Sequence, residues 1–94
     1  MAMKYLRVGW KHHHSDEPVI LYSEVDDNRF EVRKIDVFRD GRCGYASSDG
    51  ASGGTKLGLV AVPALNEIAS DPQFEPVEIT REEFEEAWAR RKAR

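Results

Sequence analysis

The chain has 94 residues, a formal net charge of −3, 40% hydrophobic residues and 33% charged residues. This balance predicts one globular domain over residues 1–94 and argues against a general nucleic-acid binder, which would usually be basic. No apolar run approaches the roughly 18 residues of a membrane span, and the first residues lack the apolar core of a secretory signal, so we expect no membrane partner and a cytoplasmic location.

The first predicted element is a strand over residues 3–11. Its apolar set alternates with Tyr5, Arg7 and Gly9, which is the period of a strand with one face in the core. The apolar set consists of Leu6, Val8 and Trp10.

A polar connection follows at residues 12–17 and contains three consecutive histidines. Adjacent side chains of an extended chain point to opposite sides, so only His12 and His14 could bind a metal together, with Asp16 or Glu17 as a third ligand. Such a loop site would lack supporting partners behind its ligands. We therefore interpret the run as a solvated loop and expect no metal ion and no cofactor.

Pro18 to Ala46 is the stretch around which the chain is organised, and it predicts three strands. Asp40-Gly41 suits a two-residue type I′ turn, which would pair Phe38 with Cys43. The polar loop Asp26–Arg29 would pair Val25 with Phe30. The apolar parity then changes along the third predicted strand, which predicts a β-bulge or a sharp bend near Arg33-Lys34.

This register gives the sheet two different faces. The apolar face, which we expect to form the core, carries Val19, Leu21, Ser23, Val25, Phe30, Val32, Ile35 and Val37. The opposite face mixes aromatic and charged side chains, and six of them are candidate binding residues: Tyr5, Arg7, Tyr22, Glu24, Arg33 and Tyr45. Tyr and Arg are enriched at protein interfaces, which favours a binding surface. A solvated sheet surface, or a face covered by a second helix or another molecule, explains the same residues.

The middle of the chain is rich in glycine. Ser47–Thr55 predicts a mobile hairpin or Ω-type loop, since the order Gly54-Thr55-Lys56 does not match a phosphate-binding loop. Lys56–Val62 predicts a short edge strand. Pro63 then favours a brief helix over residues 64–69, and an extended segment with Phe74, Val77 and Ile79 should cross the sheet.

The last element is a helix with a clear start. Thr80 and Glu83 have the spacing of a capping box, and Phe84, Ala87 and Trp88 form one apolar stripe. We expect Phe84 and Trp88 to pack on the core face. The contacts predicted for them are Leu6, Val8, Leu21, Val32 and Val37. Acidic residues fill the first turns and basic residues fill the last, namely Arg90, Arg91, Lys92 and Arg94. This order complements the helix dipole and indicates a helix end more than an RNA-binding arm.

The predicted fold class is α+β: an antiparallel four- to five-stranded bent β-meander, with a short helix and a C-terminal helix packed on one face. The chain also resembles a family of short bacterial proteins known as a domain of unknown function. The resemblance covers nearly the whole chain and rests on Trp10-Lys11-His12, Asp16-Glu17-Pro18, Tyr22-Ser23-Glu24, residues 29–34, Phe38-Arg39-Asp40-Gly41, residues 54–58 and residues 84–88. His13-His14 departs from its pattern, and the resemblance implies no activity.

Two hypotheses about function follow. The first is a protein-interaction or binding module, of an immunity-like or partner-masking kind, that uses the six residues of the mixed face. The second is a small hydrolase or ligand-binding enzyme with a pocket near the His12–Asp16 and Gly50–Thr55 loops. Cys43 has no evident histidine partner, and Glu24, Glu31 and Asp36 are explained by ion pairing, so we favour the first hypothesis. A homodimer paired through an exposed strand edge is compatible with either.

Overall fold

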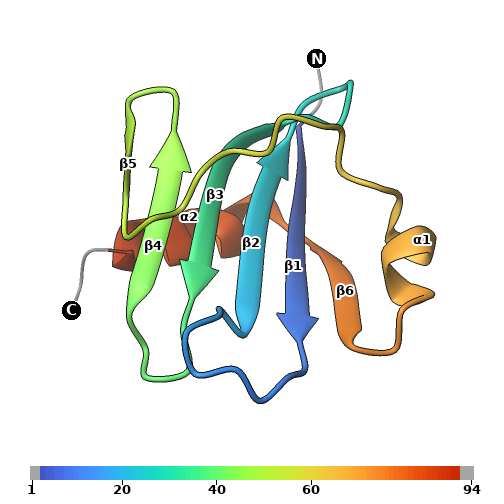
Figure 1. The fold of residues 1–94 in the computed structure, drawn as a ribbon. Coiled ribbons are helices and arrows are strands. Elements are labelled where there is room, and N and C mark those ends of the chain that lie inside the picture. The colour runs from blue at the N-terminus through green and yellow to red at the C-terminus, as the bar shows by residue number, and fades with distance from the viewer. Residues whose placement is uncertain (1–2, 92–94) are drawn as a thin grey trace.

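The computed structural model describes residues 3–91, which form a six-stranded antiparallel sheet and two helices. The strands are β1 (Lys4–Trp10), β2 (Ile20–Val25), β3 (Glu31–Val37), β4 (Cys43–Ser47), β5 (Gly50–Ser52) and β6 (Phe74–Ile79), and the helices are α1 (Leu65–Ala69) and α2 (Arg81–Arg90). The sheet order is β5-β4-β3-β2-β1-β6 (Figure 1). The α+β class and the antiparallel sheet are confirmed. The strand count exceeds four to five because β5 and β6 are added at the two edges.

The hairpin between β3 and β4 differs from the prediction by one residue. Val37 pairs with Cys43, and the Phe38 N–H donates to the Arg42 carbonyl (2.9 Å), so the loop has three residues rather than two. Its last residue, Gly41, has φ 92°, which is the geometry of a turn closed by one left-handed residue. The Asp40 carboxylate stabilises this loop by accepting the Arg42 N–H (3.0 Å).

The hairpin between β2 and β3 is built in the same way. The Asp26 N–H donates to the Phe30 carbonyl (3.0 Å), and Arg29 takes the left-handed position with φ 66°. The predicted pairing of Val25 with Phe30 is wrong, because Val25 pairs with Glu31. The register shift that we predicted near Arg33-Lys34 occurs one residue earlier, where Val32 is the extra residue between the two pairs Val25–Glu31 and Glu24–Arg33.

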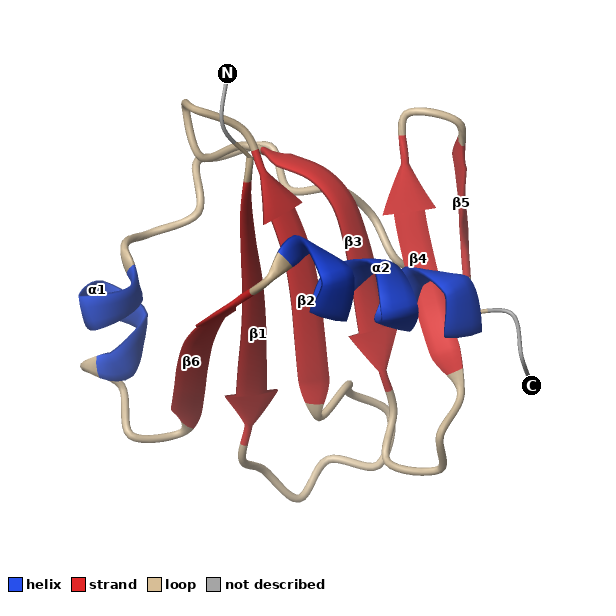
Figure 2. Cartoon of the chain, turned by 180° about the vertical axis from the view of Figure 1, so that it is seen from behind, coloured by secondary structure: helices blue, strands red, loops and turns tan. Residues whose placement is uncertain are grey.

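These one-residue differences change which side chains share a face. Ile35 pairs with Tyr45, so Tyr45 and Cys43 lie on the face of Ile35 and Val37, and not opposite to it. α2 packs on this face (Figure 2). Its core consists of Tyr5, Ile35, Phe84 and Ala87, with Tyr22, Val37, Cys43, Ile79 and Trp88 packed against it.

The predicted contacts of the last helix are therefore mostly wrong. Of the five residues expected beneath Phe84 and Trp88, only Val37 belongs to this cluster. The other four residues, Leu6, Val8, Leu21 and Val32, lie outside the described cluster. Phe30 is not a core residue either, since its side chain is 42% exposed.

The opposite face carries Leu6 and Val8 and is crossed by an irregular segment, residues 53–63, which we call the strap (Figure 1). The predicted edge strand Lys56–Val62 is wrong, because polar contacts rather than a strand ladder hold this segment. Thr55 Oγ1 donates to Asp36 Oδ2 (3.0 Å), the Gly58 N–H donates to Glu31 Oε1 (2.6 Å), and Arg29 donates to the carbonyls of Val62 and Pro63 (2.6 Å each).

The two ends of α2 follow the sequence pattern. The Glu83 N–H donates to Thr80 Oγ1 (3.1 Å) and the Thr80 N–H donates to Glu83 Oε1 (2.9 Å), which confirms the capping box. Arg90 ends the helix and Arg91 is its C-cap, whereas the predicted placement of Lys92 and Arg94 falls outside the described residues. Within residues 3–91, no helix is long and apolar enough to traverse a bilayer.

Candidate functional site

Three of the six candidate binding residues form one buried network under α2. Tyr5 and Glu24 are 9% and 7% exposed, and Arg33 Nε lies 2.6 Å from Glu24 Oε1. The same guanidinium makes two hydrogen bonds to Glu85 of α2, at 3.2 and 2.7 Å. Their position matches the alternative in which a helix covers the mixed face.

The electrostatics of this network are those of a closed structural cluster. Hydrogen bonding to Glu85 is the main effect that raises the pKa of Arg33, and the same contact lowers the pKa of Glu85. Burial, followed by the hydrogen bond to Glu24, raises the pKa of the Tyr5 phenol. The Arg33 guanidinium also lies over the rings of Phe84 and Trp88, with its carbon 4.8 and 5.0 Å from the ring centroids. Arg33 thus attaches α2 to the sheet and has few donors left for a partner.

The remaining three candidate residues lie on the same face of the sheet but outside this network. Arg7 is exposed on β1, where it pairs with Tyr22 of β2 and Val77 of β6. Tyr22 is half-buried against the core under α2. Tyr45 lies on β4, and its ring meets that of Trp88 edge-on at 5.8 Å. The structure therefore does not bring all six residues to one open surface.

Tyr45 belongs to a different cluster, in which the central residue is Arg91. The Arg91 guanidinium carbon lies 3.9 Å from the Trp88 ring centroid and 4.8 Å from that of Tyr45. Its Nη1 donates to the Trp88 carbonyl (2.7 Å), while its Nε is buried without a hydrogen-bond partner among the described residues. Sequence reasoning assigned Arg91 only to the helix end. The spacing could have indicated its role, because Arg91 follows Trp88 by three residues and both side chains therefore lie on one side of the helix.

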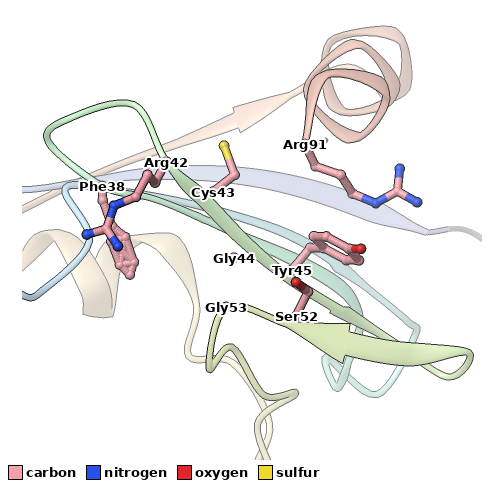
Figure 3. A pocket seen from close by; sticks show the side chains of 8 residues that line it. All are labelled: Phe38, Arg42, Cys43, Gly44, Tyr45, Ser52, Gly53 and Arg91. Carbon is pink, nitrogen blue, oxygen red and sulfur yellow. The ribbon is translucent and has the colours of Figure 1, made fainter. Parts of the chain in front are cut away.

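Two cavities adjoin this cluster, and both are lined by Tyr45 and Arg91. One of about 410 Å³ lies between the end of α2 and the β4–β5 hairpin (Figure 3). Among residues 3–91, its lining contains no carboxylate and consists of Phe38, Arg42, Cys43, Gly44, Tyr45, Ser52, Gly53 and Arg91. The other, of about 550 Å³, extends along the same hairpin and includes Arg33, Asp49 and Trp88. We call the space formed by both cavities the Arg91 cleft.

Figure 3 shows how the side chains of the smaller cavity lie. Arg91 reaches from the helix over the Tyr45 ring, and Ser52 lies beneath that ring. Arg42 lies at the other end beside Phe38, and its guanidinium carbon is 5.3 Å from the Phe38 ring centroid. Guanidinium and hydroxyl groups around a cavity without carboxylates can hold an anionic group by charge-assisted hydrogen bonds.

The loops proposed for a hydrolase do not assemble into one site. The Gly50–Thr55 segment consists of β5 and the turn after it, and neither cavity of the Arg91 cleft, to which this segment contributes, is lined by a residue of the His12–Asp16 loop. His12 Nδ1 accepts the His14 N–H (2.9 Å), so Nε2, which lies 2.7 Å from the Pro18 carbonyl, must be the donor. Both ring nitrogens are thus occupied. The larger cavity of the Arg91 cleft, which Gly50 lines, contains no histidine.

Comparison with known proteins identifies one family. A family model described as "Domain of unknown function (DUF6881)" matches residues 4–93, and this description names no activity. No curated protein and no solved structure matches the chain.

Proposed function

Because the chain belongs to this family of unknown function, we propose from its geometry that it is a protein-interaction module whose Arg91 cleft holds an acidic segment of a partner protein. The observation that carries the proposal is the Arg91 guanidinium, which is partly desolvated and forms no ion pair within residues 3–91. A desolvated cation without a counter-charge is costly, and an incoming carboxylate removes that cost.

The surroundings of Arg91 support a protein partner. Tyr, Trp and Arg are the residue types that dominate binding energy at protein interfaces, and the cleft combines Tyr45, Trp88 and Arg91. Arg91 is also preorganised, because stacking on two rings and the bond to the Trp88 carbonyl fix its orientation before a partner arrives. Arg33 provides the contrast, since Glu24 and Glu85 already neutralise it.

Several broader features belong to the same proposal. Capture of an acidic segment suits an immunity-like module that masks its partner. A cytoplasmic location agrees with the unpaired Cys43. The resemblance to a family of short bacterial proteins implies that the protein is bacterial. A homodimer through a strand edge has weaker support, because β5 has only three residues and β6 carries Pro76.

The test is selection from a displayed library of random peptides on the immobilised protein. We expect enriched peptides to contain Asp or Glu, and to lose about tenfold in affinity on Arg91→Gln through the loss of a charge-assisted bond. Arg90→Gln is the matched control, because it removes the same charge from the neighbouring exposed residue. Near-ultraviolet circular dichroism of both variants is the control that tests whether Trp88 keeps its packing. Enriched peptides without acidic residues, or peptides that bind Arg91→Gln as tightly as the original protein, would contradict the proposal.

A further inference from the structure

A second cavity lies on the other face of the sheet, toward α1 and away from the Arg91 cleft. Its volume is about 370 Å³. It is lined by Val8, Leu21, Glu31, Val62, Pro63, Glu67, Ile68, Asp71 and Phe74. Figure 1 shows the elements that surround it, with α1 beside β6 and the strap crossing the sheet above β1 and β2. We call it the α1 cavity.

The α1 cavity has an apolar floor. Val8 pairs with Leu21 across β1 and β2, so their side chains are neighbours on one face of the sheet. Phe74 continues this floor from β6, and Ile68 of α1 forms a wall. Val62 and Pro63 belong to the part of the strap that Arg29 holds by its two bonds to carbonyl groups. The cavity is therefore formed by elements that are fixed independently of any ligand.

The charged groups of the cavity are all carboxylates. Glu31, Glu67 and Asp71 line it. Within residues 3–91, no basic side chain lines it and none of the three carboxylates forms an ion pair. Glu31 accepts hydrogen bonds from Ser23 and Gly58, and Asp71 accepts two from Gln73. Glu67 is exposed, and its carboxylate has no hydrogen-bond partner among the described residues.

Two cations near the cavity are engaged elsewhere. Arg29 directs its donors to the carbonyls of Val62 and Pro63, and the Lys11 ammonium pairs with Glu75 at 3.1 Å. Neither neutralises the three carboxylates. Negative charge around an apolar, low-dielectric surface raises the local concentration of cations.

We propose that the α1 cavity binds an alkylammonium group, with the aliphatic chain on the floor of Val8, Leu21 and Phe74 and the ammonium at the carboxylates. A primary ammonium has three donors and no acceptor, so a rim of carboxylates matches it and a rim of mixed charge would not. Small-molecule sites typically combine an apolar lining with a few polar groups that fix orientation, as here. This ligand chemistry is shared by free alkylamines and by the lysine side chain.

The experiment is an NMR titration of the full chain with pentylamine, and with pentanol as the neutral ligand of similar shape. We expect pentylamine to shift the amide signals of residues in the floor and to bind about tenfold more tightly than pentanol, which is the effect of one favourable charge contact. Glu67→Gln should reduce pentylamine affinity several-fold and leave pentanol affinity unchanged. Glu82→Gln removes an exposed helical carboxylate from α2 and should change neither affinity.

A third ligand, Nα-acetyl-lysine amide, distinguishes the two sources of the ammonium. Affinity equal to that of pentylamine assigns the cavity to lysine side chains of a partner, whereas much weaker binding assigns it to free amines. The proposal is overturned if pentylamine binds no more tightly than pentanol, if the shifted signals lie outside the cavity, or if Glu67→Gln and Glu82→Gln behave alike.

Discussion

Replacing Arg33 with methionine tests the buried network that attaches α2 to the sheet. Methionine keeps an unbranched apolar side chain against Phe84 and Trp88 but removes the positive charge. The Glu24 side chain, which is only 9% exposed, would then lose its cation and keep the Tyr5 hydroxyl as its neighbour. An uncompensated buried carboxylate is among the few causes of severe destabilisation by a single substitution.

The magnitude follows from the exposure of the two ion pairs. Unit charges about 4 Å apart attract by about 4 kcal/mol at an effective dielectric constant of about 20, and removal of one partner of a buried pair typically costs about 3–5 kcal/mol. The pair with Glu85 adds only about 0.5 kcal/mol, because the Glu85 side chain is 41% exposed and screened by solvent. We expect Arg33→Met to lower the free energy of unfolding by about 4 kcal/mol.

Urea denaturation followed by tryptophan fluorescence measures this loss. Arg42→Met is the matched control, because Arg42 also lies over an aromatic ring, whereas its ion pair with Asp40 is 67% and 58% exposed and should contribute little to stability. The double variant Glu24→Gln, Arg33→Met removes both buried charges and should recover most of the loss. A cost below about 1 kcal/mol for Arg33→Met, or a double variant as unstable as the single one, would refute the reasoning.

Three further predictions concern the strap and the cap of α2. Burial raises the pKa of Asp36, so its protonated form favours folding, and this contribution to stability is lost as the pH rises from the unfolded pKa through the folded pKa. Asp36→Asn should therefore raise the free energy of unfolding by roughly 1 kcal/mol at neutral pH and by less at acidic pH. Unfolding curves that give the same change at both pH values would contradict this prediction. Gly44→Ala should cost about 1–3 kcal/mol by urea denaturation, because its new methyl group would meet Thr55 Oγ1 and the Gly53 carbonyl, and an unchanged midpoint would refute this contact. Thr80→Ala should cost about 1 kcal/mol through loss of the bond to the Glu83 N–H, and Thr80→Ser, measured in parallel by thermal unfolding, should restore it.

The parts of the fold that the sequence predicted well depend on local chemistry. The capping box of Thr80 and Glu83 is formed within four residues, so nothing distant alters it. The turn-forming residues around Gly41 likewise locate a hairpin, and the parity change near Val32 locates a register shift. In each case the sequence predicted the position of the feature to within one residue.

A register shift of one residue, however, moves a side chain from one face of a sheet to the other. The Asp40-Gly41 pair suits a two-residue turn as well as a three-residue loop in which only Gly41 is left-handed. The second choice pairs Val37 with Cys43 and puts Tyr45 on the face of Ile35. The Asp40-Gly41 pair by itself therefore does not decide between them.

The charges of the mixed face also indicate that it is covered within the fold. Glu24 and Arg33 pair directly across β2 and β3, and α2 supplies Glu85 to the same guanidinium. Complementary charges on a strand pair and on a helix indicate an internal contact as readily as an external one. A candidate binding residue is better sought where a charge lacks its complement within the fold. Arg91 meets that criterion among residues 3–91 and Arg33 does not, which is why the proposed site lies at the end of α2 and not beneath it.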